Sequence, residues 1–84
     1  MRTKETMGAI DGLLKARRDI AEHRNALIAR RRNTMDAWES TREGEERRDL
    51  SRTYGELYET TSALTDTLKG IDAQLAILTK DVDA

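Results

Sequence analysis

The only histidine, His23, lies among carboxylates and is the first place to look for metal chemistry. Asp19 precedes it by four residues, so the two side chains share a face if this stretch is helical, and Glu22 is its direct neighbour. One imidazole and two carboxylates form a weak ligand set compared with the histidine- and cysteine-rich sets of zinc sites. The chain also has no cysteine. We interpret these residues as a solvated helix face and predict no metal and no other cofactor.

Nucleophilic catalysis has no better candidate. The three serines, Ser40, Ser51 and Ser62, occur in no Gly-x-Ser-x-Gly turn. The chain also has no glycine-rich loop of the kind that cradles a phosphate. We therefore predict that the protein is not an enzyme.

Arginines form the most basic part of the chain, and phosphate is a ligand that such a tract could bind. The tract is Arg30-Arg31-Arg32, with Arg17, Arg18 and Arg24 upstream. No aromatic residue is interleaved for base stacking, acidic residues dilute the tract, and the net charge of the chain is −1. We favour carboxylates of a partner helix as its ligands. A small RNA- or DNA-binding dimer, similar in general plan to plasmid copy-control helical hairpins, is kept as an alternative.

The second half of the chain carries a long apolar seam. With no proline and only five glycines, the 84 residues favour long helices. From residue 50 onward the apolar side chains recur with a mean spacing of about 3.5 residues, the period of a coiled coil. The members of this predicted interaction seam are Leu50, Leu57, Leu64, Leu68, Ile71, Leu75 and Leu78.

The first half has a less regular stripe, which arginines interrupt. Its predicted seam members are Leu14, Ile28, Met35 and Trp38. The seam positions between them are held by three arginines spaced seven apart: Arg17, Arg24 and Arg31. Polar residues at such positions typically cost stability while fixing register and partner, so we predict that these arginines determine register and specificity.

The two stripes are out of phase, which indicates two helices and not one. Continued past Trp38, the first stripe falls on polar residues, whereas the second begins about half a period away at Leu50. A turn lets both apolar faces meet. Ser40–Glu43 has the form of a capping box, and Gly44 suits a helix C-terminus.

We therefore predict an all-α fold, an antiparallel helical hairpin of coiled-coil type. It forms a single domain over 1–84, with helices at about 4–39 and 46–81 and the turn within 39–46. Residues whose numbers sum to 85 should face each other, which directs the three seam arginines toward acidic residues of the second helix: Arg17 to Asp72, Arg24 to Asp66 and Arg31 to Glu59. The charges agree, because residues 1–38 carry nine positive and five negative side chains, and residues 50–84 carry three and six.

An isolated hairpin of this size buries little, since cores of chains below about 70–80 residues supply only ~3–5 kcal/mol. We therefore expect assembly into a helical bundle, with itself as partner in a homo-oligomer or with another helical protein. The leading hypothesis is a non-enzymatic interaction protein that acts as an assembly subunit, adaptor or small chaperone. The sequence contains no apolar run of the length that a membrane span or a signal peptide needs. This favours a cytoplasmic or virion-associated protein, with leaderless export left open.

Trp38-Glu39-Ser40 lies near the predicted turn and resembles the motif of WXG100-type proteins, small helical hairpins exported by type VII secretion with Trp-x-Gly at the turn. Chain length and hairpin order are similar. Ser40 replaces the glycine, and the family's C-terminal Tyr-x-x-x-Asp/Glu signal is missing, because Tyr54 is followed by Tyr58 and Tyr58 by Ser62. The resemblance implies a type VII secretion substrate or partner, which we keep as a second alternative.

Overall fold

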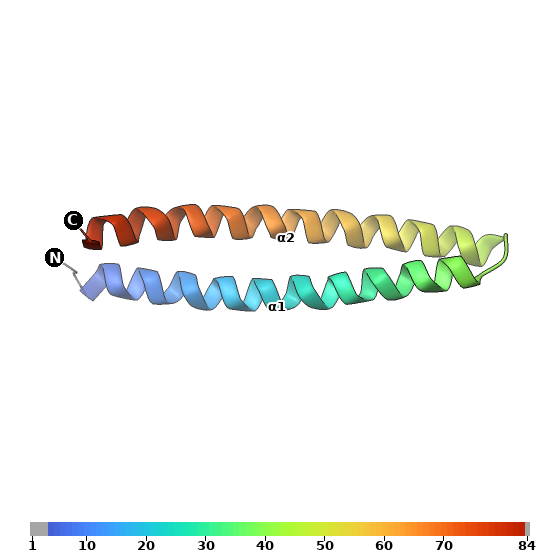
Figure 1. Cartoon of the computed structure of the whole chain (residues 1–84), viewed down its shortest axis with the longest axis horizontal. Coiled ribbons are helices and arrows are strands. Elements are labelled where there is room, and N and C mark those ends of the chain that lie inside the picture. The colour runs from blue at the N-terminus through green and yellow to red at the C-terminus, as the bar shows by residue number, and fades with distance from the viewer. Residues whose placement is uncertain (1–3, 84) are drawn as a thin grey trace.

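The computed structural model describes residues 4–83, with the side chains of residues 4–80. Two long helices account for this range apart from a short turn: α1 spans Lys4–Ser40 and α2 spans Glu45–Asp83. They lie antiparallel and side by side, with both ends of the chain at one end of a rod and the turn at the other (Figure 1). The rod measures 62 × 14 × 14 Å. The predicted all-α antiparallel hairpin is thus confirmed, and its helices extend one or two residues beyond the predicted bounds.

Residues 41–44 form the turn, which depends on a glycine. Gly44 has a φ of +142°, a backbone conformation that L side chains rarely adopt. Its carbonyl accepts a hydrogen bond from the Arg48 amide at 3.2 Å in the first turn of α2. Gly44 therefore precedes α2 as its N-terminal cap, whereas the sequence suggested that it ends α1.

The predicted capping box that begins at Ser40 is wrong. The Ser40 hydroxyl donates to the Asp36 carbonyl at 2.9 Å, so it faces back into α1 and not forward into a new helix. The next residue, Thr41, donates its amide to the Trp38 carbonyl at 3.3 Å. The Ala37 carbonyl accepts a hydrogen bond from the Thr41 hydroxyl instead, at 2.6 Å. This satisfies one of the carbonyls that have no backbone partner at the end of a helix.

The seam of α2 lies against α1, and its centre is the least exposed part of the protein. Leu57, Thr61 and Leu68 are buried, with at most 9% of their surface exposed. The remaining predicted seam residues of α2 are partly buried: Leu50, Leu64, Ile71, Leu75 and Leu78. No side chain in the described part of the chain is fully buried. The core between the two helices is therefore thin.

The orientation of α1 differs from the prediction. Leu14, a predicted seam residue, is 50% exposed, whereas its neighbour Leu13 is partly buried. Burial and contacts define the row that faces α2 as Ile10, Leu13, Arg17, Ile20, Arg24, Leu27, Arg31 and Trp38. Ile28 and Met35 are partly buried at the edge of this row. Arginine can lie in such a row because its stem covers apolar surface while its head reaches a polar partner or water.

Candidate interaction surface

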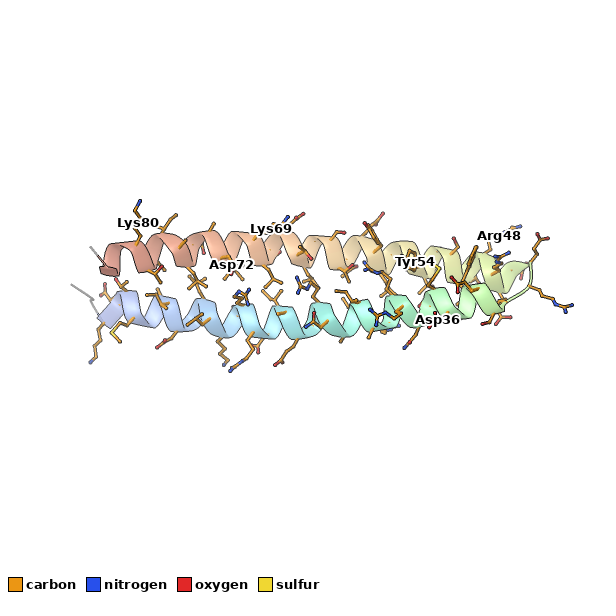
Figure 2. The ribbon with its side chains drawn as sticks, viewed as in Figure 1. Asp36, Arg48, Tyr54, Lys69, Asp72 and Lys80 are labelled. Carbon is orange, nitrogen blue, oxygen red and sulfur yellow. The ribbon has the colours of Figure 1, made fainter. Side chains whose placement is uncertain are left out.

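Arg17, the first arginine in the seam, pairs with the carboxylate predicted for it. Its Nε donates to Asp72 Oδ1 at 2.6 Å, from α1 to the side of α2 that faces it (Figure 2). The hydrogen bond to Asp72 and the negative charge of that carboxylate raise the pKa of Arg17 above its ordinary value. Both side chains are about half exposed, and an ion pair this exposed contributes little stability.

Arg31, the third arginine, contacts neutral groups and not Glu59 as predicted. Its Nη1 donates to Thr61 Oγ1 at 3.0 Å, and its guanidinium carbon lies 5.0 Å from the centre of the Tyr58 ring. The Thr61 hydroxyl donates in turn to the Tyr58 carbonyl at 2.9 Å. Thr61 is only 3% exposed, so Thr61 and the partly buried Arg31 form a polar layer within the apolar seam, with the half-exposed Tyr58 ring at its outer edge.

Arg24, between these two, has no comparable partner. Its Nε is buried and makes no hydrogen bond within the described part of the chain, where the predicted contact with Asp66 is also not formed. A buried donor without an acceptor destabilises a fold by about 1–3 kcal/mol. We therefore expect Arg24 to lower the stability of the hairpin taken alone.

Trp38 closes the turn end of the seam. The guanidinium carbon of Arg47 lies 3.8 Å from the centre of the Trp38 ring, within the range of a cation–π interaction. Trp38 and Met35 from α1, together with Ser51 and Tyr54 from α2, line a cleft of about 130 Å³. Met35 thus lies beside Tyr54, one turn further along α2 than the Leu50 that the predicted register placed opposite it.

A second apolar row follows α1 beside the seam, and we call it the outer row. Its five members recur every seventh residue: Met7, Leu14, Ala21, Ile28 and Met35. Met7 is 47% exposed and Leu14 50% exposed, while the other three are partly buried. At 1.5 Å per residue the outer row is about 42 Å long. The sequence pattern predicts three of them, Leu14, Ile28 and Met35, as seam residues. The unbroken heptad spacing of all five is a signal that would have distinguished the two rows.

Shallow clefts accompany the outer row along its second half. Ile28 lines a cleft of about 350 Å³ with Tyr58, which is itself 53% exposed, and with the polar layer at Thr61. The next cleft, of about 210 Å³, lies between Ile28, Met35 and Tyr54. The cleft at Trp38 is mainly apolar, whereas the larger cleft at Ile28 is lined mostly by polar side chains, and Arg31 and Arg32 contribute to the one between Ile28 and Met35. The exposed apolar side chains and the hollows thus occupy opposite halves of the outer row.

The other candidates from the sequence remain dispersed on the surface. His23 is exposed on α1, and the described residues contain no group of three or more histidine, cysteine or acidic side chains that could hold a metal ion. Arg30 and Arg32 are exposed, and neither side chain makes an ion pair in the described part of the chain. Within the same range, neither helix has a stretch apolar enough to cross a lipid bilayer.

Comparison with known proteins assigns no relative. No family model matches the chain, and no match was found among curated proteins or solved structures. The resemblance to WXG100-type proteins accordingly rests on Trp38, on chain length and on hairpin order. In the structure Trp38 lies inside α1, and Ser40 is the last residue of that helix.

Proposed function

We propose that this protein is a non-enzymatic helical interaction module, acting as an assembly subunit, adaptor or small chaperone, and that the outer row of α1 is its docking surface. The observation that carries this proposal is the combination of a thin core with a heptad row of apolar side chains beside it, two of which are about half exposed. Met7, Leu14 and Tyr58 are each about half exposed on this side of the rod. A heptad row favours a helical partner, because only another helix can follow it along its whole length.

The energetics of the hairpin support a role in association. Two helices of this length share a single interface, and of the side chains that the structure describes only two leucines and one threonine are buried in it. Covering the outer row would remove apolar surface from water at about 25 cal/mol per Å². A partner would therefore supply the stabilisation that the thin core lacks.

Light scattering on the purified chain, over about a hundredfold range of concentration, tests this function. We expect association, and we expect Leu14→Glu to reduce it because the charge replaces an exposed apolar contact. The matched control is Ile77→Glu, since Ile77 is 63% exposed but lies on α2 away from the outer row, in a groove with Gly12 and Leu13. A compact, stable monomer at every concentration, unaltered by Leu14→Glu, would contradict the proposed function.

A second candidate function, binding of RNA or DNA, is supported by one observation. The side chains of Arg30 and Arg32 are exposed and form no ion pair with described residues, so both are accessible to phosphate. Salt-dependent binding that is lost in Arg30→Glu/Arg32→Glu would favour this candidate. Binding of nucleic acid that is unchanged in the double variant, or no binding at low salt, would rule against it.

A further inference from the structure

We propose that the partner of the outer row is a second copy of this chain, with the two α1 helices antiparallel about a two-fold axis beside Ala21. This inference rests on the proposed function and names the partner and its geometry. Three independent observations support it: the sizes of the outer-row residues, the match of exposed side chains to hollows, and the charges beside the row.

The outer row is symmetric in size about its centre. Ala21 is the third of five members, flanked by Leu14 and Ile28 at seven residues and by Met7 and Met35 at fourteen. A two-fold axis at Ala21 therefore places methionine against methionine, leucine against isoleucine, and alanine against alanine. An isologous interface needs a surface of this kind, which is complementary to itself.

The exposed side chains and the hollows match in the same arrangement. Met7 and Leu14 protrude from the first half of the outer row, while the clefts lie beside Ile28 and Met35 in the second half. Antiparallel pairing brings Met7 of one copy to the mainly apolar cleft at Met35 of the other, and Leu14 to Ile28 and the half-exposed Tyr58 ring at the edge of the more polar cleft. A parallel pair would instead place protruding side chains against each other and hollows against hollows. The antiparallel pair allows knobs-into-holes packing at both ends.

The charges beside the outer row are also complementary to those of a second copy, about a two-fold axis close to Ala21. The row on its far side from α2, which we call the charged row, is made of exposed residues spaced seven apart: Lys4, Asp11, Arg18, Asn25, Arg32 and Glu39. In the antiparallel pair Lys4 comes close to Glu39 of the second copy, and Asp11 to Arg32. Arg18 meets the neutral Asn25. The charged row therefore opposes unlike charges, although residues 1–38 are positive overall. On the other side of the outer row, which faces α2, Arg17 and Arg31 are already hydrogen-bonded to Asp72 and Thr61.

The exposed area is sufficient for such an interface. The chain exposes 6536 Å². A compact monomer of its mass of 9.6 kDa would expose about 5,100 Å². The excess, about 1,400 Å², is larger than the ~800 Å² that each partner buries in a typical specific interface. A second rod of equal length covers this surface lengthwise.

Disulfide cross-linking tests the geometry, and the absence of cysteine from the sequence makes single-cysteine variants unambiguous. We expect oxidised Ala21→Cys to form a covalent dimer about tenfold faster or more than the matched control Ala26→Cys, an exposed alanine on another face of α1. We also expect Met7→Cys to cross-link with Met35→Cys when the two chains are mixed, and each to cross-link poorly with itself. Cross-linking of Met7→Cys with itself in an associated protein would overturn the antiparallel arrangement.

A charge reversal tests the charged row without altering the apolar contacts. Asp11→Arg should weaken the dimer about tenfold, because the two-fold axis repeats the lost contact. Adding Arg32→Asp in the same chain should restore the affinity to within about twofold. Association that neither change affects would overturn this inference and leave the proposed function standing. A monomer at all concentrations would contradict both.

Discussion

Replacing Arg24 by leucine should stabilise the protein, because Arg24 contributes a buried Nε with no hydrogen-bond partner to the seam. Relief of one unsatisfied buried donor is worth about 1–3 kcal/mol, and the leucine side chain packs against the apolar seam that the arginine stem now covers. We expect a gain of about 2 kcal/mol, which in a domain of this size raises the melting temperature by about 10 °C. The assay is thermal unfolding followed by circular dichroism at one chain concentration. Lys15→Leu, at an exposed position outside the seam, is the control and should change stability by less than about 0.5 kcal/mol.

The other two seam arginines should respond differently, since both have partners on α2. Arg31→Leu removes the donor to Thr61 and the contact with the Tyr58 ring, so it should give no gain. The triple substitution of all three seam arginines by leucine should still raise the melting temperature and broaden association into mixed or larger oligomers. A clear loss of stability in Arg24→Leu alone would refute the reasoning, because it would mean that the Arg24 charge has a partner.

Three further substitutions test local features. Thr61→Val should destabilise by about 1 kcal/mol, because it leaves the partly buried Arg31 donor without its acceptor. Thr60→Val at an exposed position should have a smaller effect, and equal effects in chemical denaturation would argue against the polar layer. Gly44→Ala should destabilise the protein by about 1–2 kcal/mol because of the positive φ at this position. Gly70→Ala should stabilise it by about 1 kcal/mol, since an added methyl group meets open space inside α2. A higher melting temperature for Gly44→Ala would contradict the first prediction, and a lower one for Gly70→Ala the second. Arg47→Met should change the fluorescence of the single tryptophan, because it removes the cation from the face of the ring. It should change stability by only about 0.5 kcal/mol, since the loss of the cation–π contact offsets the removal of a buried Nε that has no hydrogen-bond partner. Unchanged emission would show that the cation does not lie over the ring.

The hairpin itself could be predicted because its signals are local and periodic. The α2 seam keeps one spacing from Leu50 to Leu78, and the phase difference at Trp38 requires a turn. The capping box failed because Ser40 has an alternative acceptor, the carbonyl four residues back in its own helix. Which acceptor the Ser40 hydroxyl uses depends on where the helix ends. The sequence near a turn does not fix the end of a helix to within one residue.

The orientation of α1 could not be predicted, for a different reason. Two adjacent rows of α1 are apolar enough to face a partner, and they differ in that one contains the seam arginines. In the structure that row faces α2, and the heads of Arg17 and Arg31 lie against Asp72, Thr61 and Tyr58. Those partners are 27 or more residues distant along the chain, so their positions follow from packing and not from local pattern.

On the proposed dimer, folding and association are linked through the same helix. The row of α1 that faces α2 contains three arginines, one of them unsatisfied, so the hairpin alone is weakly stabilised. A binding event that covers the outer row adds its free energy to the stability of the fold, which makes the melting temperature depend on chain concentration. Substituting Arg24 by leucine strengthens the seam alone, so it should raise the melting temperature most at low concentration, where the partner contributes least.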